Sequence, residues 1–207
     1  MSEGGQTHKT LAGPSGPFPL REKKSKFMGY AFPAKTREEA EASLTALKKE
    51  HHGATHVCYA YRIGPLPGAV RVSDDGEPAY SAGAPILGKI ESSGLTDVLV
   101  CVVRYYGGTK LGVGGLIQAY RNAAGLALEN AVVLEVEPVE VLGLLFEYER
   151  LDAVMRFIAQ NQLELRSQQM ALDCALELAV PPADLDRVLE GLRSLGPLTI
   201  KIHGTRD

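Results

Sequence analysis

Five glycines crowd the segment between residues 107 and 115, with a lysine among them. The glycines are Gly107, Gly108, Gly112, Gly114 and Gly115, and the lysine is Lys110. Glycine loses more conformational entropy on folding than any other residue, so this density needs a physical reason. Either the backbone packs where side chains do not fit, or bare amides at the start of a helix approach an anion. The phosphate-loop patterns GxxxxGK[ST] and GxGxxG are both absent here, and both interpretations stay open.

A second cluster is the acidic turn DDGEP, which contains Asp74, Asp75 and Glu77. Carboxylates this close can hold Mg²⁺ or act as acid and base, although a hard cation takes about six oxygen ligands and one turn supplies only a few. The alternative is a tight turn in which Asp74 or Glu77 accepts hydrogen bonds from backbone amides or arginine. We treat these three residues as a conditional acidic site.

Cations and tyrosines lie before and among the glycines. A surface that gathers Arg104, Tyr105, Lys110 and Arg121 would present positive charge and stacking rings, which suits the backbone and unpaired bases of a nucleic acid. The alternative is ordinary solvated charge, with arginines that neutralise Asp74 and Asp75. Further lysines, at positions 23, 24 and 26, precede the first predicted strand.

Other side chains that could do chemistry stand alone. His56 belongs to no serine-histidine-aspartate, GxSxG, HExxH or CxxC arrangement, which favours a structural histidine. Cys58, Cys101 and Cys174 lie far apart within apolar runs and are predicted to be buried, reduced thiols. The sequence therefore predicts no catalytic residue, no metal ligands and no cofactor.

The glycine segment is predicted to join a central strand to a helix. Residues 97–104 are apolar on both faces, as in a strand inside a sheet, and the residues after 115 repeat at helical spacing. Thr36 and Glu39 form a capping box that opens a helix over 37–51. The remaining predicted elements are strands over 26–33, 55–62 and 70–73 and a short helix from Pro85 to near Gly94.

A second unit is predicted to start near Pro138, with the element order βαββαβ. Its strands cover 139–148, 163–169, 171–180 and 198–203, and its helices cover 151–160 and 184–195. From residue 139 onward the chain has seven Lys and Arg against eleven Asp and Glu, which disfavours phosphate contact there. The predicted organisation is a flexible tail over 1–20, one domain over 21–137 and another over 138–207.

Composition limits the class of protein. The chain has 207 residues, of which 45% are hydrophobic, enough for packed cores, and no apolar run approaches the length of a membrane span. The first residues lack both the charged and the apolar regions of a secretion signal. We therefore expect a cytoplasmic protein that does not bind membranes.

Longer strings of the sequence resemble the IMPACT family, bacterial YigZ type. They are DDGEP, SAGAPIL at 81–87, VVRYYGGTKLGVGGL at 102–116 and QAYRNAA at 118–124, with KKSKF at 23–27 and ATHVCYAYRIG at 54–64. The resemblance implies an α+β protein with an amino-terminal ribosomal-protein-S5 domain-2-like domain and a ferredoxin-like carboxyl-terminal domain. That pairing is similar to the last two domains of elongation factor G.

The resemblance also implies a function. The eukaryotic relative regulates translation under stress and binds a ribosome-associated activator protein, whereas no established enzymatic activity attaches to the bacterial members. We expect a non-enzymatic regulator that binds RNA or the ribosome. Two alternatives stay open, an Mg²⁺-dependent enzyme that holds a nucleotide or phosphorylated small molecule at the glycines, and a module that binds a translation-associated protein.

Three positions depart from the family pattern. Tyr80-Ser81 stand near the place where many relatives have a Gly-Thr pair, so the tyrosine ring narrows any pocket beside the acidic turn. Gln118 stands where relatives often carry a basic residue, which removes one cation from the predicted surface. Val57 stands where many have asparagine, which removes a polar group beside His56.

Overall fold

The computed structural model describes residues 7–64 and 68–206 of the chain. The chain divides into two compact units, His8–Glu135 and Val136–Asp207, each with its own sheet and core. Both units mix helices with antiparallel strands, so the fold is α+β, as the sequence predicts. No helix within the described residues is long and apolar enough to cross a membrane.

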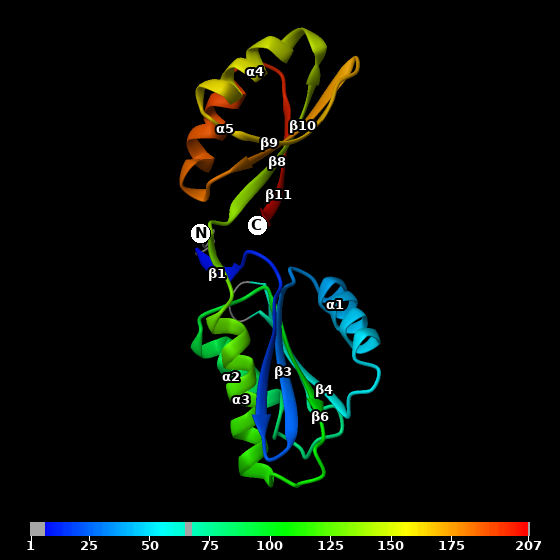
Figure 1. The fold of residues 1–207 in the computed structure, drawn as a ribbon. Coiled ribbons are helices and arrows are strands. Elements are labelled where there is room, and N and C mark those ends of the chain that lie inside the picture. The colour runs from blue at the N-terminus through cyan, green and yellow to red at the C-terminus, as the bar shows by residue number, and fades with distance from the viewer. Residues whose placement is uncertain (1–6, 65–67, 207) are drawn as a thin grey trace. The chain divides into compact units, whose positions relative to one another are not determined.

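A five-stranded antiparallel sheet forms the centre of the first unit (Figure 1), with the strand order β2-β3-β6-β4-β5. The strands are β2 (Ser15–Glu22), β3 (Ser25–Pro33), β4 (His56–Ile63), β5 (Ala69–Ser73) and β6 (Val98–Tyr105). Helices α2 (Gly83–Ser92) and α3 (Val113–Glu129) cover one face of this sheet, and α1 (Arg37–Glu50) covers the other.

The central strand is β6, as its apolar sequence predicts. Its residues from 98 to 103 are fully buried, because the strand has a neighbour on each side and helices over both faces. Alternate residues enter two different cores, so that Val102 packs toward α2 and α3 whereas Val103 packs toward α1. The same alternation directs Arg104 and Tyr105 to opposite faces of the sheet.

The helix starts follow the capping chemistry that the sequence predicts. Thr36 Oγ1 accepts a hydrogen bond from the Glu39 amide at 3.2 Å and opens α1. Pro85 lies in the first turn of α2, where its missing amide hydrogen costs no helical hydrogen bond. Helix α3 begins directly after Gly112, which confirms the predicted order of strand, glycine segment and helix.

The prediction of a flexible tail over residues 1–20 is wrong for most of its described part. Strand β1 (His8–Leu11) pairs with β7 (Val133–Val136), and β2 forms an edge of the main sheet. Phe18 and Leu20 alternate along β2 and pack against the core beneath α2 and α3. Gly16, Pro17 and Pro19 lie in this edge strand, where proline is tolerated. Residues 1–6 lie outside the described residues.

The second unit has the predicted element order βαββαβ. Its elements are β8 (Val139–Glu147), α4 (Leu151–Gln160), β9 (Glu164–Gln169), β10 (Asp173–Val180), α5 (Leu185–Ser194) and β11 (Thr199–Arg206), with 3-10 turns at Tyr148–Arg150 and Pro182–Asp184. The antiparallel sheet has the order β11-β8-β10-β9. Both helices cover the same face, where Leu142, Leu176 and Leu178 are buried.

Candidate functional site

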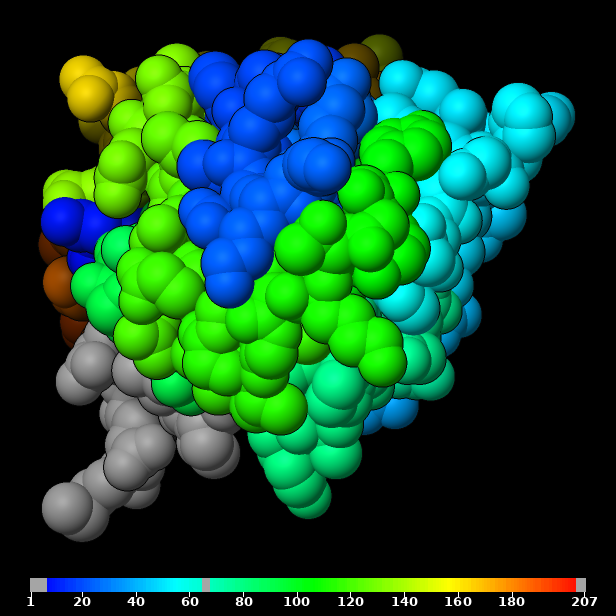
Figure 2. Space-filling view, turned by 60° about the horizontal axis from the view of Figure 1, so that its bottom comes forward, coloured from blue at the N-terminus to red at the C-terminus, as the bar shows by residue number. Residues whose placement is uncertain are grey.

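One end of the first unit's sheet brings the glycine segment against the turn between β2 and β3. The Gly107 amide donates to Oγ of Ser25 at 3.2 Å, and a methyl group on Gly107 would overlap the Lys24 carbonyl. Figure 2 shows this end, with the β2–β3 hairpin in blue beside the glycine segment in green. We call the two-residue turn Lys23-Lys24 together with residues 106–114 the hairpin–loop surface.

The five glycines of the segment have different structural reasons. Gly107 is required by its close approach to the neighbouring turn. Gly108 and Gly112 have φ values of +81° and +77°, a region that favours glycine. Gly115 lies against a leucine side chain, whereas a methyl group on Gly114 would meet nothing within 4 Å and its φ is not positive. The fold therefore gives no packing or conformational reason for Gly114.

The amino terminus of α3 lies at the hairpin–loop surface without a cap from the chain. Its N-cap residue is Gly112, which has no side chain, and its first turn contains no Asp or Glu. By contrast, Thr36 caps α1, and the Asp74 carboxylate accepts hydrogen bonds from the Ala82 and Gly83 amides at the start of α2, at 2.9 and 2.8 Å. Among these three helices, α3 alone leaves the positive end of its dipole open to an external anion.

Exposed lysines flank this helix terminus. Lys23, Lys24 and Lys110 are exposed, and none forms an ion pair within the described part of the chain. Lys23 and Lys24 form a two-residue hairpin turn, because Glu22 pairs with Ser25 across β2 and β3. Their φ values are 41° and 68°, a conformation that Asn-Gly usually supplies and that costs other residues about 1 kcal/mol or more each. The turn thus carries two lysines where Asn-Gly would be more stable.

Arg121 and Gln118 lie on the exposed side of α3. The Gln118 side-chain amide donates to Asn122 Oδ1 at 2.8 Å, so these two exposed residues add no charge to the surface. Arg121 is exposed and lies eight residues beyond Val113, which places it about 12 Å along the helix axis. Arg121 therefore extends the positive charge along α3 and lies apart from the glycines.

Arg104 is buried, and the expectation that it is a surface cation is wrong. Its side chain is only 5% exposed, and its guanidinium donates to Glu77 Oε1 at 2.5 Å. The same carboxylate oxygen accepts the Tyr120 hydroxyl at 2.7 Å, and Arg104 also contacts the Ser25 hydroxyl at 3.3 Å. The alternation of β6 directs this arginine beneath the helices, where a buried carboxylate neutralises it. Arginine therefore does neutralise the acidic turn, through Glu77 and not through the aspartates.

Tyr105 lies on the opposite face of the sheet and does not belong to the hairpin–loop surface. Its hydroxyl is 2.8 Å from Nδ1 of His51, whose Nε2 is 2.6 Å from the Tyr30 hydroxyl. The ring that accompanies Arg104 is Tyr106, which is 45% exposed and has its centroid 5.3 Å from the guanidinium carbon. The exposed ring beside the glycines is thus Tyr106.

The acidic turn is used by the fold itself. Asp74 caps α2, Asp75 accepts the Val57 amide at 2.7 Å, and Glu77 pairs with Arg104. These carboxylates bind three different partners, whereas a hard cation requires oxygens that converge on one point. Among the residues that the structure describes, no group of three His, Cys, Asp or Glu side chains is arranged to hold a metal ion.

Cys58 and Tyr120, which lie behind the acidic turn, are kept neutral by burial. Burial raises the pKa of the Cys58 thiol to about 12 and holds the pKa of Tyr120 far above its usual range. Tyr120 therefore remains a hydrogen-bond donor to Glu77. His56 has Nδ1 2.8 Å from the Asp75 carbonyl and Nε2 3.9 Å from Glu77 Oε1, as expected of a structural histidine. All three cysteines are buried and unpaired, as predicted.

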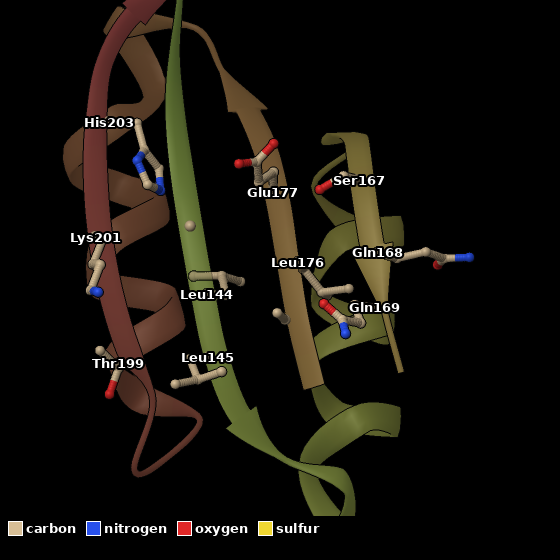
Figure 3. A pocket seen from close by; sticks show the side chains of 12 residues that line it. Leu144, Leu145, Ser167, Gln168, Gln169, Leu176, Glu177, Thr199, Lys201 and His203 are labelled. Atoms are coloured by element: carbon tan, nitrogen blue, oxygen red, sulfur yellow. The ribbon is translucent and has the colours of Figure 1, made fainter. Parts of the chain in front are cut away.

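The second unit has a shallow hollow of about 530 Å³ on the sheet face opposite α4 and α5 (Figure 3). Leu145, Glu177 and Lys201 are among the residues that line it. Its side chains mix apolar, acidic and basic character, and the net negative charge of this unit opposes contact with phosphate. We therefore place the candidate site on the first unit.

The sequence analysis names Lys23 and Lys24 as nearby cations but does not place them in the predicted surface, because a tail over 1–20 leaves no strand before them to form a hairpin. The signal that could have placed them is the alternation of Phe18 and Leu20 with other residues, which is typical of a strand. A strand ending at Glu22, followed by another starting at Ser25, predicts a hairpin with the two lysines at its turn.

Known proteins resemble this chain over both units. The model of the Impact N-terminal domain matches residues 23–128. The IMPACT family member in pol 5′ region of Thermus thermophilus is 53% identical over 108 residues, which are 52% of this chain and 57% of that protein. IMPACT family member YigZ of Escherichia coli is 32% identical over 163 residues, 78% of this chain and 80% of its own. A crystal structure of a hypothetical protein, 30% identical, covers 94% of this chain and 96% of its own with a TM-score of 0.75. The chain therefore belongs to the IMPACT family.

Proposed function

We propose that this protein acts in translation as a non-enzymatic regulator that binds RNA, ribosomal RNA included, through the hairpin–loop surface. The observation that carries the proposal is the meeting of exposed Lys23, Lys24 and Lys110 with the uncapped start of α3. Clustered lysines and the amides of a helix start are both groups that bind phosphate. A chain of phosphates fits such a surface better than a single anion, because the cations lie on separate segments.

Membership of the IMPACT family supports the link to translation, because the resemblance implies descent shared with a regulator of translation under stress. The net charge supports the choice of surface, since the first unit carries no excess of negative charge and the second does. Gly114 adds to this support. Its bare backbone on an exposed helix turn allows a phosphate to approach the amides closely.

No specific observation favours the alternative of an Mg²⁺-dependent enzyme. The carboxylates Asp74 and Glu77, which such an enzyme would need, hold α2 and Arg104 in place. The buried Cys58 thiol is not a nucleophile at neutral pH, because its pKa is raised to about 12. The remaining alternative, a protein partner, is an outcome of the experiment below.

Co-sedimentation with salt-washed ribosomes tests the proposal. We expect the protein to pellet with ribosomes at low salt and to dissociate as salt rises, because phosphate contacts release counterions. A Lys23→Ala/Lys24→Ala variant should stay in the supernatant. Lys49→Ala removes an exposed charge from α1 and should behave like the wild type.

Equal pelleting of the double variant and the wild type would contradict the proposed surface. Pelleting that survives both high salt and nuclease treatment would favour a protein partner over RNA.

A further inference from the structure

A stack of side chains runs from the core of the first unit to its surface. Phe27 is fully buried and meets Tyr120 edge to face, with ring centroids 5.2 Å apart. The guanidinium carbon of Arg104 lies 5.3 Å from the Phe27 centroid and 5.3 Å from the Tyr106 centroid. The buried cation is thus held between an internal ring and an exposed one, and Tyr106 ends the stack.

The backbone at Tyr106 is fixed by hydrogen bonds, and its ring lies against Arg104. Its amide donates to Thr55 Oγ1 at 3.0 Å, and the next residue, Gly107, donates to Ser25 and packs against the lysine turn. The attraction between ring and guanidinium adds to these bonds, and Glu77 holds the guanidinium in place. An exposed ring under these constraints loses little further freedom when a ligand stacks on it.

The chemistry of Tyr106 differs from that of the lysines beside it. Lysines and helix amides contact phosphates and do not distinguish a single strand from a duplex through base contacts. An exposed aromatic ring offers a face on which a base can stack, and unpaired bases are the ones free to do so. Tyr106 is 45% exposed, whereas Arg104 beneath it is only 4% exposed, so the accessible part of the stack is the ring.

We infer that Tyr106 is a stacking platform for an unpaired base, so that the hairpin–loop surface prefers single-stranded RNA to duplex RNA. This inference rests on the proposed function, because Lys23, Lys24 and α3 supply the phosphate contacts and Tyr106 adds the base contact. Stacking requires only the flat face of a base, so the preference is for unpaired strands and not for a particular sequence.

Fluorescence anisotropy with a short labelled RNA, free or annealed to its complement, tests the inference. We expect the wild type to bind the single strand more tightly, and Tyr106→Leu to lose about tenfold in single-strand affinity with little change for the duplex. Tyr106→Phe keeps the ring and should keep the affinity. Tyr148→Leu removes a 59% exposed tyrosine from the second unit and should have no effect. The salt slope of Tyr106→Leu should equal that of the wild type, because no phosphate contact is lost.

The outcomes separate this inference from the proposed function. Equal wild-type affinity for the two RNA forms, or unchanged single-strand affinity in Tyr106→Leu, would overturn the stacking platform and leave RNA binding in place. Absence of RNA binding by the wild type would overturn both. If Tyr106→Leu does not fold, RNA that contains 2-aminopurine tests the wild type directly. Quenching of its fluorescence on binding supports stacking, and unchanged fluorescence contradicts it.

Discussion

Arg104 and Glu77 form a buried ion pair, with guanidinium and carboxylate 2.5 Å apart and side chains 5% and 4% exposed. The pair ties the end of β6 to the acidic turn, and the Tyr120 hydroxyl completes it from α3. Each charge neutralises the other where little of either side chain is exposed, so neither is available to a ligand. Arg104, which the sequence places among the surface cations, therefore supports the hairpin–loop surface from beneath.

Removal of one partner of this pair should destabilise the protein strongly. Arg104→Ala leaves the Glu77 carboxylate buried without a counter-charge, and we expect a loss of about 3–5 kcal/mol in the free energy of unfolding. The double variant Arg104→Met/Glu77→Leu removes both charges and should lose much less. Urea unfolding followed by circular dichroism measures both. A loss below about 1 kcal/mol in Arg104→Ala would show that the pair is not buried in solution.

Two glycines of the same segment should respond oppositely to alanine. Gly107→Ala places a methyl group on the Lys24 carbonyl, and we expect a loss of about 1–3 kcal/mol in stability. Gly114→Ala meets open space in the first turn of α3 and should gain about 0.5–1 kcal/mol, because alanine favours the helix. Thermal and urea unfolding compare the two variants. A Gly114→Ala variant less stable than the wild type would refute the assignment of Gly114 to an open position.

Tyr80 should be a site at which glycine stabilises the protein. Its φ is +62°, its ring is 78% exposed, and its amide is fixed by the Asp74 carboxylate at 2.8 Å. Tyr80→Gly removes the backbone strain and should gain about 0.5–1 kcal/mol after the added chain entropy is subtracted. Tyr80→Ala removes the ring but keeps the strain, so it should stay close to the wild type. Equal stability of the Gly and Ala variants would contradict this explanation.

Stability should fall at alkaline pH because buried acids stay protonated in the folded state. Burial raises the pKa of Cys58 from 9.0 to about 12, so the unfolded thiol releases its proton first. The contribution of the protonated thiol to the free energy of unfolding is fully present below pH 9. It is lost between pH 9 and 12, by up to about 1.4 kcal/mol per pH unit. Cys58→Ala should show a shallower decline in urea unfolding across this range. If the free energy of unfolding fell with pH at the same rate in Cys58→Ala and in the wild type, the role of the buried thiol would be contradicted.

The elements that local chemistry determines could be predicted from the sequence. The apolar run of β6, the Thr36 cap of α1 and the order βαββαβ each depend on residues close together in the chain. The strands within residues 7–20 are not evident from composition, because glycines and prolines conceal the alternation of Phe18 and Leu20. For that segment, the glycine and proline content predicts a tail, whereas the alternation of apolar residues correctly indicates a strand.

The site depends on contacts between distant residues, which explains why its predicted membership changed. Arg104 is buried because of Glu77, 27 residues earlier in the chain, and the alternation of β6 alone does not reveal that partner. The lysine turn reaches the glycines through the contact of Ser25 with Gly107, 82 residues apart. Glycine spacing could indicate a backbone that allows close approach, but not which segment makes that approach.

The central claim is that RNA phosphates bind the hairpin–loop surface, and fluorescence anisotropy of labelled single-stranded RNA over a salt series tests it most directly. The wild type, Lys23→Ala/Lys24→Ala, Lys110→Ala and the control Lys49→Ala would be compared. We expect affinity to fall with salt, and the slope of log affinity against log salt to decrease by about 0.7 for each lost phosphate contact, with Lys49→Ala like the wild type. The claim would be contradicted if Lys23→Ala/Lys24→Ala and Lys110→Ala both kept the affinity and the salt slope of the wild type. It would also be contradicted if the wild type bound no RNA at low salt.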